Sequence, residues 1–206
     1  MKNTKDKILA TALDLFNRYG LPKVTLRSIA QEMGISQGNL NYHFKKRAEI
    51  VEGLYFQLVA TMDKSISEIT NQELSLALIL DLQQFIMHNF YTYRFFLLDF
   101  VQIIREHETI KKHYLTLSKQ REEQFMELAT ILIHKKIFRE AILPNEYRFL
   151  YTRFQILGDF WISAATLTNE TFNETLIDQH YEMIVQSIYP YLTAEGQRDY
   201  KVLIPS

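Results

Sequence analysis

The chain has 206 residues, of which 47% are hydrophobic, and a formal net charge of -1, so it can bury a core of its own and is not a disordered protein. It contains no cysteine, which excludes disulfides and thiolate metal ligands. Its longest apolar runs, "LSLALIL" and "FFLLDFVQII", are far shorter than the roughly 20 residues that cross a bilayer, and the start "MKNTKDKILATALDLF" lacks the apolar core of a signal peptide. We therefore expect a cytoplasmic protein with no membrane partner.

The charge is unevenly distributed along the chain. Residues 1–50 hold nine Lys and Arg against four acids, a balance of +5, and the remainder has a balance of -6. A basic region of this size is typical of a nucleic-acid-binding module. We therefore predict two domains, a small basic one at 1–50 and a larger, mildly acidic one at 51–206.

Apolar residues recur at three- and four-residue spacing almost throughout, and only six glycines and four prolines interrupt them, so we predict an all-α fold. The first helix ends at Gly20, a second is capped by Thr25, a third runs from the cap Ser36 to about His43, and a fourth begins near Lys46. Further helices are expected over about 72–89, 92–105, 109–138, 145–167 and 171–189. Capping-box pairs are expected at Thr70/Glu73 and Thr171/Glu174, with one short turn after Thr193.

The second and third helices have the spacing of a helix-turn-helix. Ala30 allows the helices to approach closely, Gly34 permits the turn, and Leu40 anchors the third helix to the core. A helical hairpin with a glycine turn is also an ordinary structural element, so the spacing alone leaves DNA binding open.

The surface of the third helix favours DNA binding. With Leu40 and Phe44 facing inward, polar side chains cover the other faces. Amides can bond to adenine edges in the major groove, and hydroxyl, aromatic and basic groups can hold phosphates. The candidate DNA-binding residues on and beside this helix are Ser36, Gln37, Asn39, Asn41, Tyr42, His43, Lys45, Lys46 and Arg47.

Residues 1–50 resemble the DNA-binding domain of the TetR family of bacterial transcriptional regulators. The segments "ILATALDLFNRYG", "VTLRSIAQEMGIS" and "QGNLNYHFKKRAEI" together match the family's pattern. The resemblance implies that the third helix enters the major groove and that a larger helical domain senses a ligand and forms the dimer. It also implies phosphate contacts by Thr25 and Arg27, phosphate or sugar contacts by Tyr42 and His43, and a phosphate contact by Arg47, where a lysine is usual.

Asn39 and Asn41 stand where the family often has a hydroxyl residue and a tyrosine. Both positions lie on the surface that reads the bases, so the resemblance does not supply an operator sequence. The implied function is that of a homodimeric repressor that binds a palindromic double-stranded DNA operator and is released by a small molecule.

The larger domain is rich in aromatic residues, which mostly fill cores but can collectively line a cavity when polar groups lie among them. The candidate ligand-pocket residues are Phe85, His88, Asn89, Phe96, Phe100, Phe125, Phe154 and Trp161. Their ligand cannot be identified from the sequence.

The last two long helices carry small residues that permit close helix approach and apolar residues that a partner could cover, although both kinds also complete monomer cores. A two-fold operator requires a two-fold protein, which favours a homodimer. The candidate interface residues are Gly158, Ala165, Phe172, Leu176, Ile184 and Ile188.

We find no pattern typical of catalysis, and we expect no enzyme activity, cofactor or metal. In "REHETIKKH" the histidines are six residues apart, whereas a zinc-binding helix needs them four apart. The chain has no phosphate-binding glycine loop and no nucleophile elbow. Two alternatives stay open: a helical protein-interaction adaptor without specific DNA binding, and a small-molecule-binding or enzymatic protein whose basic patch holds an anionic substrate.

Overall fold

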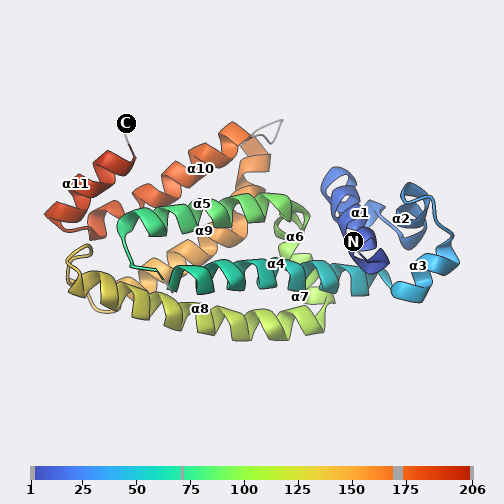
Figure 1. Cartoon of the computed structure of the whole chain (residues 1–206), viewed down its shortest axis with the longest axis horizontal. Helices are drawn as coiled ribbons and strands as arrows, with labels where there is room; N and C mark the ends of the chain where they lie inside the picture. Colours follow the sequence, from blue (N-terminus) through green and yellow to red (C-terminus); the bar gives the residue numbers. More distant parts are fainter. Residues whose placement is uncertain (1–2, 71, 169–173, 205–206) are drawn as a thin grey trace. The chain divides into compact units, whose positions relative to one another are not determined.

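Helices account for nearly all of the ordered secondary structure in the computed structural model, which describes residues 3–70, 72–168 and 174–204 (Figure 1). Within these residues, the only strand-like pairing is one isolated antiparallel bridge between Phe138 and Leu192. The predicted all-α fold is confirmed.

The chain divides into two compact units. The first contains the residues up to Met62 together with Thr92–His113, and the second contains Asp63–Tyr91 and the residues from Tyr114 onward. Helices α4, α5 and α8 each contain residues of both units. The first unit thus contains residues 51–62 and the segment Thr92–His113 in addition to the region 1–50 that the sequence assigned to the N-terminal domain.

The helices that begin in the first unit follow the predicted order, with one short 3₁₀ turn (η1) added. They are α1 (Thr4–Tyr19), η1 (Leu21–Lys23), α2 (Leu26–Glu32), α3 (Gln37–His43), α4 (Arg47–Thr70), α6 (Arg94–Leu98), α7 (Phe100–Glu106) and α8 (Glu108–His134). One helix was expected over 92–105, but α6 and α7 are separate because the backbone leaves helical geometry at Asp99, with φ -103° and ψ 18°.

Local capping explains where α2 and α3 begin. The Thr25 hydroxyl accepts a hydrogen bond from the Ser28 N–H at 3.1 Å, and the Ser28 hydroxyl accepts one from the Thr25 N–H at 2.9 Å. This reciprocal pair satisfies two backbone donors that a helix start leaves unpaired. At the turn, Gly34 has φ 65°, a conformation that strains any residue with a side chain.

Helix α1 is joined to α6 by contacts that the sequence did not reveal. The Asn17 side chain donates to the Thr92 carbonyl at 2.8 Å and accepts from the Phe95 N–H at 3.1 Å. The rings of Phe16 and Phe95 stack with their centroids 5.0 Å apart. Residues 75 or more positions apart in the chain therefore fix α6 to the N-terminal helices.

The remaining helices begin in the second unit. They are α5 (Leu76–Thr92), α9 (Glu146–Thr168), α10 (Glu174–Gln186), η2 (Tyr189–Tyr191) and α11 (Ala194–Leu203). The helix expected over 72–89 begins later, and Ser75 accepts a hydrogen bond from the Leu78 N–H at 3.3 Å near its start. The capping pair expected at Thr70/Glu73 includes a side chain that the structure does not describe. The pair expected at Thr171/Glu174 lies outside the residues that the structure describes.

A buried cluster contributed by α5, α8, α9, α10 and α11 holds the second unit together. Its members include Leu80, Leu132, Leu150, Ile188 and Tyr200. The helix expected over 109–138 ends earlier, at His134, and Lys136 then adopts φ 59°, which turns the chain toward α9.

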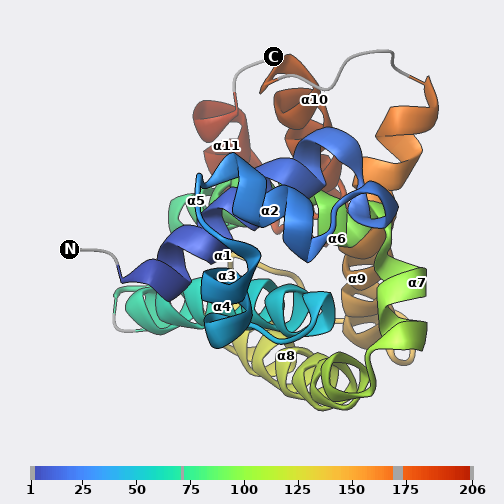
Figure 2. The same ribbon diagram turned by 90° about the vertical axis from the view of Figure 1, so that its right-hand side faces the viewer.

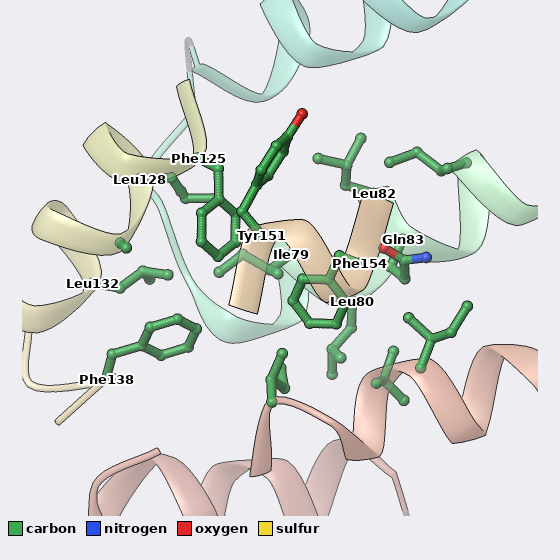
Figure 3. Close-up of a pocket in the computed structure, with 15 residues that line it drawn as sticks. Ile79, Leu80, Leu82, Gln83, Phe125, Leu128, Leu132, Phe138, Tyr151 and Phe154 are labelled. Carbon is green, nitrogen blue, oxygen red and sulfur yellow. The ribbon is translucent and has the colours of Figure 1, made fainter. Parts of the chain in front are cut away.

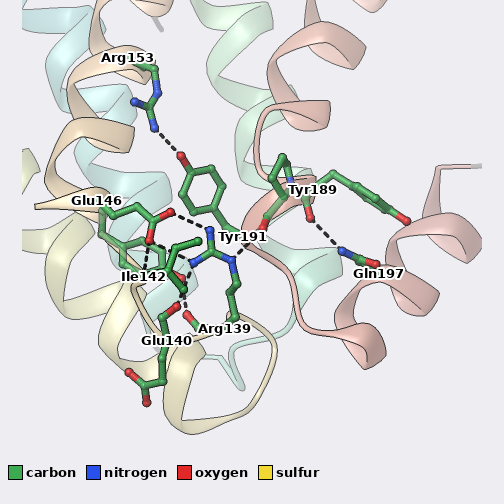
Figure 4. A network of polar contacts seen from close by, with 10 residues as sticks. Arg139, Glu140, Ile142, Glu146, Arg153, Tyr189, Tyr191 and Gln197 are labelled. Atoms are coloured by element: carbon green, nitrogen blue, oxygen red, sulfur yellow. Dashed lines mark hydrogen bonds and ion pairs between the residues drawn. The ribbon is translucent and has the colours of Figure 1, made fainter. Parts of the chain in front are cut away.

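A polar clamp fixes the loop between α8 and α9 (Figure 4). The Arg139 guanidinium forms two hydrogen bonds with the buried Glu146 carboxylate, at 2.7 and 3.0 Å, and its Nε donates to the Pro190 carbonyl at 3.0 Å. The Ile142 N–H donates to the same carboxylate at 2.8 Å. These hydrogen bonds from Arg139 and Ile142 lower the pKa of Glu146 to about 2.

Replacing Glu146 by glutamine should lower the melting temperature at pH 7 by several degrees, because Arg139 loses its charged partner. The folded carboxyl has a pKa below its ordinary 4.5, so its stabilisation is present above about pH 4.5 and lost as the pH falls through about 2. Denaturant unfolding across this range should show the difference between parent and variant shrinking as the pH falls. Glu140→Gln, on the exposed neighbouring glutamate, is the matched control, and an equal effect there would contradict the prediction.

Candidate functional site

Helix α3 is anchored by apolar side chains and exposes polar ones. Leu40 is fully buried and Phe44 is nearly so. The Ser36 hydroxyl caps the helix by accepting the Asn39 N–H at 3.1 Å. On the rest of the helix, Gln37, Asn39, Asn41 and Tyr42 are exposed, with Tyr42 at 84%. The structure thus places the predicted reading residues at the surface.

The exposed residues of α3 lie on different sides of the helix. Each residue turns a helix by about 100°, so Gly38 and Tyr42 lie opposite the buried Leu40, with Asn39 and Asn41 on either side of them. A Cβ atom at Gly38 would meet nothing closer than the Ser36 hydroxyl oxygen, 3.9 Å away. Gly38 therefore leaves the backbone open on the outermost strip of α3, beside Tyr42, and amides flank this strip. Sequence reasoning did not identify this position of Gly38.

The basic residues after α3 differ in what they contact. Lys45 and Lys46 are exposed, and the Glu49 carboxylate accepts the backbone N–H of Lys45 at 2.8 Å. Arg47 is instead half-buried, and its Nη1 donates to the carbonyls of Leu21 and Val24 at 2.8 and 3.2 Å. This nitrogen of Arg47 therefore holds the turn before α2, and the phosphate contact expected of the residue stays a prediction.

The other expected backbone contacts lie at the surface of the same unit. Thr25 and Arg27 are exposed at the start of α2, and the half-buried His43 ring meets the Tyr42 ring edge to face, with centroids 5.2 Å apart. Figure 2 shows α2 and α3 with α3 beside the start of α4. The helix-turn-helix and its exposed polar groups thus form one continuous candidate surface.

The second unit contains an apolar cavity of about 190 Å³ (Figure 3). It is lined by residues of α5, α8, α9 and α10 and by Phe138 and Ile188. Most of its wall is aliphatic or aromatic, and among the residues that the structure describes no charged side chain lines it.

Two of the expected pocket residues, Phe125 and Phe154, line this cavity, and the other six do not. On α5 the lining residues Ile79, Gln83 and Ile86 share one face, so Phe85, His88 and Asn89 point elsewhere. Phe96 and Phe100 belong to the first unit, where the Phe96 ring stacks on Tyr55 with centroids 5.4 Å apart. Trp161 is buried beside His180, with centroids 5.2 Å apart.

Most of the expected dimer residues are buried within the single chain. Ala165, Leu176, Ile184 and Ile188 belong to its own core, so they offer a partner little surface. Gly158 is half-buried, with Phe90 3.4 Å from the position of an added Cβ, and Phe172 lies outside the described residues. Helix α9 instead exposes Phe149, Ile156 and Phe160.

A buried polar network joins α8 to α9. The Tyr114 hydroxyl donates to the Asp159 carboxylate at 2.6 Å, and the Gln155 amide donates to the Tyr114 hydroxyl at 3.0 Å and to the Ser118 hydroxyl at 2.7 Å. Burial raises the pKa of the Asp159 carboxyl to about 6, against the opposing effect of the Tyr114 hydrogen bond. Within the described part of the chain, no ion pair involves Asp159.

The residues that the structure describes contain neither a metal-ligand cluster nor a helix that could span a membrane. No group of three or more His, Asp or Glu side chains is placed to hold a metal ion. No helix in the same residues combines the length and apolar character that crossing a membrane requires.

The fold and its exposed α3 surface are those of a helix-turn-helix transcriptional regulator. The family described as bacterial regulatory proteins, tetR family, matches residues 8–54, and the family described as bacterial transcriptional repressor matches residues 57–200. The chain belongs to the TetR family of bacterial transcriptional regulators. The resemblance seen in the sequence is therefore confirmed.

Similar proteins include the probable HTH-type transcriptional regulator YttP of Bacillus subtilis (strain 168), which is 31% identical over 94 residues. That match covers 42% of this chain and 45% of YttP, less than half of each. A TetR-family transcriptional regulator from Marinobacter aquaeolei VT8 has a similar structure, with a TM-score of 0.88 at 20% identity over 98% of this chain and 97% of that one.

The ketosteroid transcriptional regulator KstR2 of Mycobacterium tuberculosis is also similar in structure, with a TM-score of 0.73 at 14% identity. The alignment covers 94% of this chain and 97% of KstR2. At these identities the two structural matches show a shared fold.

Proposed function

We propose that the chain is a homodimeric repressor that binds a palindromic operator through two copies of α3 and releases it when a small effector binds. The observation that carries the proposal is the arrangement of α3, in which Leu40 and Phe44 anchor the helix and amides flank an open outer strip. Asparagine and glutamine amides can bond bidentately to adenine in the major groove. Exposed Lys45 and Lys46 supply phosphate contacts beside it.

The exposed apolar face of α9 supports dimerisation. Phe149 and Ile156 are each 55% exposed and Phe160 is 41% exposed, at helical spacing along one side. A row of large exposed apolar residues is typical of a surface that a partner covers. A second copy is the partner that a palindrome requires, because operator symmetry mirrors protein symmetry. Phe149, Ile156 and Phe160 thus replace the buried interface residues expected from the sequence.

We propose that the effector acts by shifting a population of conformations toward one in which the two α3 helices no longer match successive major grooves, roughly 34 Å apart. Helix α4 continues from the DNA-binding module, as the sequence suggested, and α5 offers a second connection. Its residues Ile79, Gln83 and Ile86 line the cavity, and its last residue, Thr92, accepts the Asn17 hydrogen bond from α1. A change in the cavity thus has a path along α5 to a residue that is hydrogen-bonded to the first helix.

Selection from random duplex DNA, followed by fluorescence anisotropy across a salt series, tests the proposal. We expect a palindrome of two half-sites, binding that weakens steeply as salt rises, and a protein of dimeric mass by light scattering. If no sequence is enriched and binding stays at the nonspecific level, the operator assignment is wrong. The protein-interaction adaptor would then be the better reading, and tight binding of a small anion at the lysines would favour an anionic substrate.

A further inference from the structure

The cavity in the second unit is almost entirely hydrocarbon. Apart from Gln83 and Tyr151, its lining consists of aliphatic side chains and phenylalanine rings, among them Leu80, Phe125 and Phe154. Tyr151 contributes mainly its ring, because its hydroxyl points away from the middle of the cavity in Figure 3 and donates to the Ser118 carbonyl at 3.0 Å. Gln83 is therefore the one lining side chain whose polar group is available to an occupant.

The Gln83 amide can both donate and accept a hydrogen bond. Within the described part of the chain it makes no hydrogen bond to another residue, and in Figure 3 it lies beside Phe154. Its neighbour Gln84 is exposed and does not line the cavity. An oxygen atom of a ligand would thus find one uncharged partner here.

The chemistry of the wall excludes a charged group from the cavity. Moving a carboxylate, phosphate or ammonium from water into such surroundings is costly unless an opposite charge pairs with it, and none of the described residues that line the cavity is charged. A hydrocarbon occupant, in contrast, gains by leaving water. The wall therefore discriminates strongly between a neutral molecule and its charged analogue.

The volume limits the size of the occupant. An apolar cavity of about 150 Å³ can hold benzene. The cavity of about 190 Å³ is somewhat larger, so its occupant would have about six to ten non-hydrogen atoms.

We infer that the cavity takes an uncharged, hydrocarbon-rich molecule of this size with one oxygen that hydrogen-bonds to the Gln83 amide, such as a medium-chain ketone, alcohol or ester. The role of this molecule as effector rests on the proposed function, but its binding does not. The carrying observation is the lone amide in an otherwise apolar, charge-free wall.

Isothermal titration calorimetry of the full chain without DNA tests the inference with four probes of similar length. They are 2-octanone, ethylbenzene, octanoate and octylammonium. We expect 2-octanone to bind at least about 10-fold tighter than either charged probe, because the charged groups would be left without an ionic partner. Equal or tighter binding of octanoate or octylammonium would overturn the inference, and so would the absence of binding by both neutral probes.

Three variants locate the site. Gln83→Leu should weaken 2-octanone by about 3- to 10-fold, the value of one hydrogen bond, and leave ethylbenzene no weaker. Gln84→Leu, on the exposed neighbour, should change neither. Ala129→Leu should fill the cavity and abolish binding of both neutral probes. If Ala129→Leu does not fold, the effect of Gln83→Leu on 2-octanone binding decides whether the cavity is the site. If Gln83→Leu and Gln84→Leu have the same effect, the site is elsewhere and the inference fails.

The calorimetry tests the inference independently of the operator experiment. Probe binding without operator selection would leave the inference standing and remove the repressor proposal. Operator selection with no binding of the neutral probes would leave the repressor proposal standing and overturn the inference. When both succeed, adding 2-octanone to the operator complex should lower its anisotropy, and an unchanged signal would show that this class of molecule is not the effector.

Discussion

Replacing Asn39 and Asn41 together by alanine should weaken binding to the selected operator by at least about 30-fold, because each lost bidentate amide contact removes discrimination of roughly 1–3 kcal/mol. Both side chains are exposed, so the fold should be unaffected. Binding to unrelated DNA should change little, because phosphate contacts supply nearly all of it. Anisotropy titrations with operator and scrambled duplexes measure the two affinities side by side.

The matched control removes two exposed amides outside the module, as Gln84→Ala/Gln120→Ala. This control should bind the operator like the parent. If the Asn39/Asn41 variant keeps its preference for the operator, α3 does not read the bases through these amides, and the order of residues around the helix would then direct attention to Tyr42.

Substituting Lys45 and Lys46 should change the affinities in the same anisotropy assay in a different way. Lys45→Ala/Lys46→Ala should weaken operator and scrambled DNA alike and reduce the slope of log affinity against log salt by about 2, because about one phosphate contact is lost per lysine. Lys111→Ala/Lys119→Ala, on two exposed lysines of α8, controls for the change in net charge. A loss confined to the operator would contradict a phosphate role for Lys45 and Lys46.

The second large effect concerns stability and arises from Asp159. Its pKa in the folded protein, about 6, lies above the ordinary 3.8, because burial disfavours the charged form. The carboxyl therefore contributes stability below about pH 3.8 that is lost as the pH rises through about 6. At neutral pH the folded protein holds a partly buried carboxylate that accepts a hydrogen bond from the Tyr114 hydroxyl.

Asp159→Asn should therefore raise the free energy of unfolding at pH 8 by up to about 3 kcal/mol and change it little at pH 4. The amide oxygen can still accept the Tyr114 hydrogen bond, so the network keeps its geometry. Urea unfolding at intervals between pH 4 and pH 8 measures the effect. Asp178→Asn removes an exposed carboxylate from α10 and controls for net charge, and a stabilisation by Asp159→Asn that does not grow with pH would contradict the assignment.

The features that the sequence predicted well are local ones. The caps at Thr25 and Ser36 and the turn at Gly34 involve residues within five positions of one another, so their hydrogen bonds and backbone angles follow from short stretches of chain. The exposed amides of α3 follow from one helical period set by Leu40 and Phe44. The family resemblance rests on the same short motifs.

The features that the sequence did not predict join distant residues. Arg47 contacts Leu21, 26 positions away, and this contact fixes its Nη1 against the turn before α2. The sequence singles out pocket residues by their aromatic or polar character, but the face of α5 that lines the cavity is set by packing against α8, α9 and α10. Likewise, Ile184 and Ile188 have the side chains of an interface and are buried in the chain's own core.

The sequence by itself determined the all-helical class, the position of the helix-turn-helix, the polar character of its third helix and the family to which the chain belongs. Only the tertiary structure decided which apolar residues enclose a cavity, that Gln83 is the polar group in it, and that Asp159 is buried with Tyr114. The physical reason is that hydrophobic periodicity specifies which side of a helix is covered, whereas the identity of the covering residue depends on how helices far apart in the chain pack together.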